Sequence, residues 1–453
     1  MGRALKNVAG PRTAADDVSD SQADDVALNS GDGTAPCAGD RVRGPSQRLR
    51  LAFSSFQVPF FRWWFCSQIL SASGTMTQAV AQAWLVLRLG GHGLTLGAVT
   101  ACTFAPLLGG AWAGSVVDRI DRRDVLLATQ TSFLLISSTL GILTILDVVR
   151  LWMVFIGALA AGCANAFDQP ARQIYVLEIV GRERTANAVG LNEVVINASR
   201  VLGPAAGGAL LVLSGVTGCF FFNAATFVAP LLVLWHFRPA EKVPNRPRRP
   251  GQTREGLRYV MAQPAIRAAV VMAAASGMLF NLSVALPLVA TRVFHLGGGG
   301  YGLMLSTFGM GSLGGAALAA TGSSWPRGQS VRVLALVSGV TVILIAGSPD
   351  LGVALGGLFV CGFFSIWFIA RANALAQLRA APEMRGRVMG IWTMALPGMS
   401  PFTAPLVGLV CDELGPRQGF GLAGVALVLA VGFGWRALRD SPASGGAGAI
   451  AAS

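Results

Sequence analysis

The sequence predicts an all-α polytopic membrane protein, in which twelve transmembrane helices form two six-helix bundles related by pseudo-two-fold symmetry. Three observations predict this class. Only 13% of the 453 residues are charged and 53% are hydrophobic, whereas soluble globular proteins carry about 25% charged residues. Long runs without a single charge recur along the chain. Similar segments also recur roughly 200 residues apart, which indicates two related halves.

The charge-free runs supply the expected spans, because a helix crosses the bilayer core with about 20 apolar residues. The run 201–237 is long enough for one and a half spans, so we place a fifth helix from Ala186 through Arg200. With that helix the count is twelve. The runs are 63–87, 89–117, 125–146, 151–167, 201–237, 268–291, 293–326, 333–349, 351–370, 388–411 and 418–435.

An internal repeat divides the spans six and six. The segment "TFAPLLGGAWAG" from Thr103 is similar to "TFGMGSLGGAALA" from Thr307, and "GPAAGGALLVLSG" from Gly203 is similar to "APLVGLVCDELG" from Ala404. Parallel repeats of six helices, related by an axis along the membrane normal, are a known transporter plan with a substrate site between the halves.

The longest charged interruption, rich in proline and arginine, marks the boundary between the halves. We expect a disordered cytoplasmic tail over 1–55, a first bundle over 56–237, a cytoplasmic linker over 238–264, a second bundle over 265–437 and a flexible tail over 438–453. A short amphipathic helix is expected around 254–261 in the linker.

The basic residues that give the net charge of +13 are concentrated in the loops on one side of the expected membrane spans. If both termini are cytoplasmic, nineteen basic residues lie in the loops on that side, whereas only Arg88, Arg150, Arg292 and Arg417 lie in the opposite loops. This is the positive-inside bias, which sets membrane orientation. We therefore predict cytoplasmic termini, and we do not expect nucleic-acid binding.

The loop between the second and third spans carries a dense group of charges. The segment "GSVVDRIDRRDVL", from Gly114, resembles the loop 2–3 signature of the major facilitator superfamily, G-x-x-x-D-R-x-x-R-[RK]-x-x-L. "RVLGPAAGG", from Arg200, is similar to the G-P-x-x-G-G signature of that superfamily's exporters and antiporters. The sequence departs from the superfamily's loop 2–3 signature in two ways. Asp121 stands where the general motif often has glycine, and the copy of this loop in the second half, "GSSWPRGQS", lacks the acidic residue.

Further segments extend the resemblance over residues 60–437. "QAWLVLRL", "FDQPARQ", "NAVGLNEVVINASRVLGP", "EGLRYV" and "RGRVMG" look like the branch that contains the enterobactin exporter and many bacterial multidrug efflux proteins. The resemblance implies a monomeric, proton-coupled exporter of small amphipathic organic molecules in the bacterial cytoplasmic membrane, working by rocker-switch alternating access. An importer, a symporter or a facilitator of a small organic solute is the alternative.

The charged loop has local roles and one longer-range role. Asp121 and Asp124 are placed to cap the third helix, and Arg119 suits the C-terminal dipole of the second. The resemblance implies that Asp118 faces the start of the eleventh helix, near 385–387, when the cytoplasmic side is closed. A solvated topology loop is the alternative. The expected conformational latch comprises Asp118, Arg119, Arg122, Arg123, Asp168 and Arg172.

Ionisable groups inside a span are costly and point to function. Glu193, Asn197 and Arg200 share one face of the fifth helix, and Asn197 or water could bridge the two charges. We predict that Glu193 and Arg200 couple proton movement to transport; a structural polar cluster is the alternative. In the same helix, Gly203, Pro204, Gly207 and Gly208 form the antiporter motif, whose glycines allow close helix packing.

A polar stripe runs down the first helix at spacings of three and four residues. It is expected to line the central cavity, with helix–helix hydrogen bonding as the alternative. The predicted substrate-cavity residues are Gln68, Ser71, Thr75, Gln78, Gln82, Asn165, Asn197, Asn281, Trp367, Arg371, Asn373 and Trp392.

The sequence lacks the residue patterns of an ATP-driven pump and of a membrane-embedded enzyme. The two lysines, Lys6 and Lys242, are not preceded by the glycine that a phosphate-binding loop needs. Seven scattered cysteines and three histidines near span ends form no metal-ligand spacing or catalytic triad. We therefore expect no metal, no cofactor and no enzymatic activity.

Overall fold

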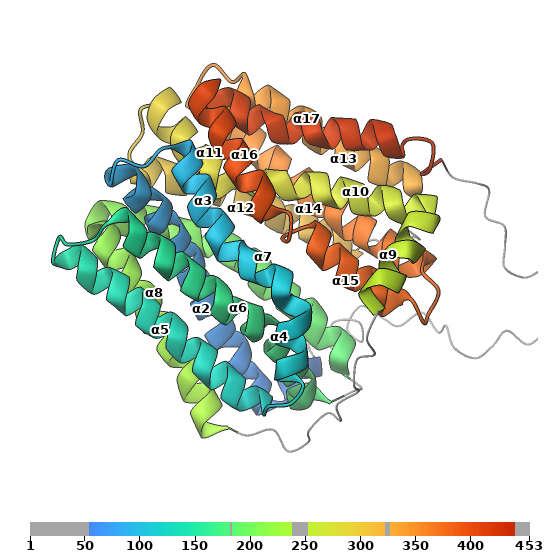
Figure 1. Cartoon of the computed structure of the whole chain (residues 1–453), viewed down its shortest axis with the longest axis horizontal. Coiled ribbons are helices and arrows are strands. Elements are labelled where there is room, and N and C mark those ends of the chain that lie inside the picture. The colour runs from blue at the N-terminus through green and yellow to red at the C-terminus, as the bar shows by residue number, and fades with distance from the viewer. Residues whose placement is uncertain (1–53, 182–183, 238–251, 322–326, 440–453) are drawn as a thin grey trace, which may run out of the picture. The chain divides into compact units, whose positions relative to one another are not determined.

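The computed structural model describes residues 54–181, 184–237, 252–321 and 327–439. Within these ranges every regular element is a helix (Figure 1). Ten helices in those ranges are long and apolar enough to cross a membrane. The predicted tails over 1–55 and 438–453 lie almost entirely outside the described residues, as do positions 238–251 of the predicted linker. The all-helical, membrane-spanning class is confirmed.

The first half begins with a 3-10 turn and continues through seven α-helices. These are η1 (Ser54–Gln57), α2 (Pro59–Arg88), α3 (Gly93–Phe104), α4 (Gly110–Val117), α5 (Arg122–Ile145), α6 (Leu151–Val180), α7 (Thr185–Leu213) and α8 (Gly215–His236). Pro59 opens α2, where its missing N–H costs nothing. Gly215 has a φ of 68°, a left-handed conformation that reverses the chain between α7 and α8 within two residues.

The second half begins with the linker helix α9 (Gln252–Ala262), so the predicted amphipathic helix around 254–261 is confirmed. The following elements are α10 (Pro264–Leu279), α11 (Leu282–Leu288), η4 (Val289–Val293), α12 (Gly298–Thr321), α13 (Gly328–Ala346), α14 (Leu351–Arg379), α15 (Arg385–Ala395), α16 (Ser400–Glu413) and α17 (Pro416–Gly434).

Two predicted spans do not meet the criteria of length and apolarity that the other ten meet. The first, α2, has 30 residues, but the glutamines, serines and threonines of its polar stripe lower its hydropathy. The second predicted span is divided by η2 (Ala105–Gly109), because Pro106 cannot donate to the α-helical ladder. The count of twelve and the two-fold relation of the halves therefore stay predictions.

Three hydrophobic cores show where the halves meet. One core is shared, since Val80 and Val99 of the first half belong to the same cluster as Met304 and Ala404 of the second. The other two cores are separate. One is built around Trp64 and Tyr175 of the first half, and one around residues of the second half such as Met272. The halves are thus joined at one end and pack independently at the other.

Figure 1 shows this difference along two helical runs. The run of α3 and α4 lies beside the run of α15 and α16, with α3 packed closely on α16. Toward α4 and α15 the runs diverge, and these two helices do not pack on each other to a comparable extent. We call the first region the α3–α16 end and the second the α4–α15 end.

Candidate functional site

The charged loop lies between α4 and α5, at the α4–α15 end. Asp121 is the N-cap residue of α5, and its carboxylate accepts a hydrogen bond from the backbone N–H of Arg123 at 3.0 Å. Asp124 lies in the first turn of the same helix. A carboxylate at this position satisfies one of the free amides of a helix N-terminus. The predicted capping role of Asp121 is confirmed.

Two arginines of the predicted latch are held within the first half. The Arg123 guanidinium donates to the carbonyl oxygens of Leu234 at 2.7 Å and Trp235 at 3.2 Å, in the last turn of α8. A cation at a helix C-terminus is favourable because the free carbonyls carry partial negative charge. The Arg122 side chain is buried, with its Nε 3.9 Å from Oε1 of Glu178. Both arginines therefore tie the loop to neighbouring helices, a role that sequence reasoning missed.

Asp118 and its predicted partners are apart in this structure. Asp118 is half-buried at the end of α4, and among the described residues its side chain makes no hydrogen bond or ion pair. Arg387, one of the expected partners, is instead paired with Glu255 of α9 at 2.6 Å. The N-cap residue of α15, Met384, makes no side-chain cap hydrogen bond. The start of α15 has therefore no side-chain cap in this conformation.

Asp168 and Arg172 form an ion pair one turn apart on α6. The Asp168 carboxylate is 1% exposed and also accepts hydrogen bonds from the Thr129 hydroxyl at 2.9 Å and the Gln130 amide at 2.8 Å. A buried carboxylate needs such partners, because an unpaired one is costly away from water. This cluster joins α5 to α6 beneath the charged loop.

The polar stripe of α2 divides into two groups. The Gln78 amide oxygen accepts hydrogen bonds from the Ser137 hydroxyl of α5 and the Asn223 amide of α8, both at 2.6 Å. Asn223 also donates to Ser137 at 3.0 Å. Gln78 therefore serves helix–helix hydrogen bonding here, which is the alternative that the sequence left open.

The other stripe residues have no cross-helix hydrogen bond among the described residues. Gln68 is buried and neither of its amide atoms has a hydrogen-bond partner. Ser71 is buried, Gln82 is half-buried and Thr75 is exposed, with the Thr75 hydroxyl donating to the Ser71 carbonyl at 2.9 Å. A cavity role for these four positions stays a prediction.

The charged face of α7 is arranged around Asn197. The Arg200 guanidinium approaches the Asn197 amide oxygen at 3.4 Å, and the Asn197 amide donates to the backbone carbonyl of Glu193 at 2.8 Å. Arg200 also lies over the ring of Phe280, with 5.3 Å from its central carbon to the ring centroid. Asn197 thus contacts both residues, although it reaches the backbone of Glu193 rather than its exposed carboxylate.

The G-P-x-x-G-G segment places α7 between α2 and α12. A Cβ on Gly203 would collide with Met76 of α2, and Gly208 faces the backbone of Gly302 on α12. Pro204 has no N–H, so the Arg200 carbonyl lacks its usual helical donor. That carbonyl lies against Gly309 of α12. The expectation that these glycines allow close packing is confirmed, and the contact extends across both halves.

The remaining cavity candidates lie mostly within the second half. The Asn281 amide, at the break between α10 and α11, donates to the Thr403 hydroxyl of α16 at 2.8 Å. Trp392 is buried in the second-half core.

Trp367 lies beside Phe363 and Phe364, and its indole N–H has no hydrogen-bond partner. Asn373 accepts a hydrogen bond from Gln377 at 2.5 Å. Arg371, like Asn165 of the first half, is half-buried.

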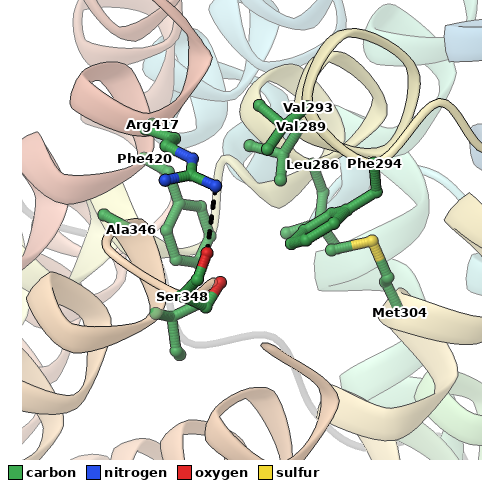
Figure 2. A pocket seen from close by; sticks show the side chains of 10 residues that line it. Leu286, Val289, Val293, Phe294, Met304, Ala346, Ser348, Arg417 and Phe420 are labelled. Carbon is green, nitrogen blue, oxygen red and sulfur yellow. Dashed lines mark hydrogen bonds between the residues drawn. The ribbon is translucent and has the colours of Figure 1, made fainter. Parts of the chain in front are cut away.

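Two of the pockets that the described residues form are lined by none of the predicted cavity residues. Figure 2 shows the first, where apolar side chains such as Phe294 and Met304 surround a space of about 10 Å³, and Arg417 donates to the Ser348 carbonyl at 3.0 Å. That volume holds no more than about one water molecule. The second is an open groove of about 710 Å³ between α4, α5 and α6, lined by residues such as Ile120 and Phe167.

The sequence matches a family model described as transmembrane secretion effector over residues 51–441. The chain belongs to this family of major facilitator superfamily transporters. The transporter therefore falls in the efflux and siderophore branch that its motifs indicated.

Curated relatives agree with this assignment over most of their lengths. The transporter is 25% identical to the staphyloferrin A transporter of Staphylococcus aureus over 388 residues, covering 81% of this chain and 93% of the relative. It is 26% identical to the multidrug efflux pump Tap of Mycolicibacterium fortuitum, covering 78% and 89%. It is also 26% identical to the enterobactin exporter EntS of Citrobacter koseri, covering 76% and 84%.

Solved structures agree on the fold. A bacterial homologue of the human lysosomal transporter Spinster, in an inward-facing and occupied conformation, superposes with a TM-score of 0.65 at 16% identity. The match covers 85% of this chain and 99% of that one. At this identity the comparison establishes the architecture and leaves the cargo of the transporter open.

Proposed function

We propose that the transporter is a proton-coupled exporter of small amphipathic organic molecules, working as a monomer in the bacterial cytoplasmic membrane by rocker-switch alternating access through twelve spans. The observation that carries the proposal is the unequal joining of the halves, with one shared core at the α3–α16 end and separate cores at the α4–α15 end. Such an arrangement is what one state of an alternating-access cycle around a site between the halves would give, and it supports the proposal.

The direction of transport is inferred from the relatives and from α7. Two of the relatives are named an efflux pump and an exporter. The antiporter-type segment of α7 lies at the interface of the halves, where Gly208 meets Gly302. A helix held between both halves is well placed to couple their movement. The names of these relatives, together with the antiporter-type segment, support export over import.

The orientation follows from the arginine bias of the loops. The loop of Asp118 carries three arginines within five residues, Arg119, Arg122 and Arg123, which favours a cytoplasmic position. The α4–α15 end is then the cytoplasmic side, and the present conformation is open to the cytoplasm. In this state cargo would reach the site from inside the cell.

Proton coupling is assigned to Glu193 and Arg200. The Glu193 carboxylate is exposed on α7, whereas Arg200 lies between Asn197 and the Phe280 ring. An acid within a span exchanges its proton more readily when it faces water than when it is enclosed. Closing and opening the space beside α7 would change the access of Glu193 to water, which gives the proposed coupling a structural route.

Substrate-driven proton movement in proteoliposomes tests this function. We expect a cargo such as an amphipathic dye to drive proton flux with the wild-type protein, and we expect Glu193→Gln to abolish that flux while cargo still binds. Glu383→Gln, at an exposed position before α15, is the matched control and should retain the flux. Proton-coupled transport by Glu193→Gln at the wild-type rate would contradict the coupling role.

Asp118 is tested by its neutral isostere. Removing a charge that caps a helix costs about 0.3–2 kcal/mol, or roughly 2- to 30-fold in the ratio of two states. We expect Asp118→Asn to favour the cytoplasm-open state and to lower turnover with little loss of expression. Asp147→Asn, at an exposed turn after α5, should transport normally. A well-expressed Asp118→Asn protein with normal turnover would show that the loop is only a topology signal.

A further inference from the structure

Asp412, at the end of α16, caps a helix of the other half. Its two carboxylate oxygens accept hydrogen bonds from the backbone N–H groups of Gly93 and Leu94, the first residues of α3, each at 2.8 Å. α3 has no cap of its own, because its N-cap residue His92 makes no side-chain cap hydrogen bond. The free amides at the start of α3 are therefore satisfied by a carboxylate from the second half.

The surroundings of Asp412 favour this contact. Its side chain is 20% exposed, so the charge is partly withdrawn from water. The positive end of the α3 dipole faces it directly. Arg292, from the end of η4, adds a second favourable charge, with its Nη1 at 3.4 Å from Oδ1 of Asp412. His92 lies further away, with Nδ1 at 3.9 Å from the other oxygen.

A seam of small residues brings the two backbones together below this cap. Ala404, Gly408 and Asp412 follow one another at intervals of one helical turn on α16. Gly97 lies against the Ala404 carbonyl, and Gly93 and Gly408 lie against each other's carbonyl oxygens. No side chain separates the backbones at these points. Asp412 reaches the amides of α3 only because the helices are in contact.

The segment that ends at Asp412 resembles the one that ends at Asp118 at three of five positions. "GSVVD" ends at Asp118 and closes the run of α3 and α4, whereas "GLVCD" ends at Asp412 and closes the run of α15 and α16. The two runs are antiparallel, so each aspartate lies at the end where the other run begins (Figure 1). Only one cap is formed in this structure, since Asp118 has no side-chain partner among the described residues.

We propose that Asp412 is a latch reciprocal to Asp118, and that the two alternate during transport. Asp412 holds the α3–α16 end closed in the state described here. When the halves rock, α3 separates from α16, the Asp412 cap breaks and Asp118 reaches the uncapped start of α15. The proposal rests on the alternating access proposed above, but it requires neither a particular cargo nor proton coupling.

Distances between spin labels measure the two states directly in the full-length protein in lipid nanodiscs. With the native cysteines replaced, one label pair at Leu94→Cys and Leu414→Cys reports the α3–α16 end. A second pair at Ile120→Cys and Glu383→Cys reports the α4–α15 end. All four positions are exposed. We expect Asp412→Asn to shift the ratio of the two states by roughly 2- to 30-fold toward opening of the α3–α16 end.

Four further variants make the result decisive. Asp350→Asn is the matched control, because Asp350 caps α14 within its own half through the Val353 amide, and it should leave the distances unchanged. Asp118→Asn should shift the ratio in the opposite direction, and the double variant should return it toward the wild-type value.

If Asp412→Asn folds poorly, Gly408→Ala, which forces α3 away from α16, should produce the same shift. Unchanged distances in Asp412→Asn or in Gly408→Ala, or a shift equal to that of Asp350→Asn, would overturn the proposal.

Discussion

At the scale of single residues, polar side chains inside the first half are mostly paired with one another. Gln78, Ser137 and Asn223 complete a three-helix network, and Asp168 is surrounded by donors from α5 and α6. Away from water a polar group without a partner within the protein is costly. Of these residues, Gln78 belongs to the stripe predicted to line the cavity, but its hydrogen bonds join α2 to α5 and α8.

Gln78 and Gln82 provide a matched pair on one helix face. We expect Gln78→Leu to destabilise the protein by about 1–3 kcal/mol, because the Ser137 and Asn223 donors lose their shared acceptor. Gln82→Leu should change stability little, since Gln82 has no side-chain hydrogen bond among the described residues. Thermal unfolding of both variants in the same detergent measures the difference. Equal melting temperatures would contradict the structural role of Gln78.

At the scale of helices, glycine and proline decide how α7 meets α12. Gly208 and Gly302 allow the two backbones to touch, and Pro204 leaves the Arg200 carbonyl free to face Gly309. In a membrane, helices associate through such close packing rather than through the hydrophobic effect. The antiporter-type segment is therefore also the main structural contact between the halves along α7.

Alanine at Gly302 tests this contact. A Cβ there would lie 2.5 Å from the Gly208 Cα and 2.9 Å from the Pro204 carbonyl oxygen, so α7 and α12 must separate. We expect Gly302→Ala to lower the melting temperature and the transport rate together. Gly356→Ala, on α14, meets nothing within 4 Å and should be neutral or slightly stabilising. Melting curves and transport assays on both variants check the expectation, and a neutral Gly302→Ala would contradict it.

At the scale of the whole molecule, the arginine distribution and the unequal joining of the halves are independent observations with a joint consequence. The first favours a cytoplasmic position for the loop that follows α4. The second shows that the halves share no hydrophobic core at the same end of the molecule. Together they predict that the resting conformation admits cargo from the cytoplasm.

Thiol labelling of intact cells tests this orientation. In a background without native cysteines, a membrane-impermeant maleimide should label Leu146→Cys, after α5, and should leave Ile120→Cys, after α4, unlabelled. Both positions are exposed, with 62% and 46% of their surface accessible, so a difference in labelling reports the side of the membrane. Labelling of Ile120→Cys from outside would reverse the proposed orientation.

The sequence by itself determined the class of protein, because a lack of charge and long apolar runs leave lipid as the only suitable solvent. Its motifs also determined the superfamily, the cap at Asp121 and the close packing of Gly203 and Gly208. These features depend on neighbours within one helix or on residue size, and both can be read from a short stretch of sequence.

Only the tertiary structure decided which distant groups meet. It directed Arg123 to the end of α8, Gln78 to α5 and α8, and Arg387 to Glu255. It also brought Asp412 to Gly93 at the start of α3, 319 residues earlier in the chain. Spacing along one helix indicates which residues share a face, but the neighbour of that face depends on how all the helices pack. For a protein that alternates between packings, that neighbour changes with the state.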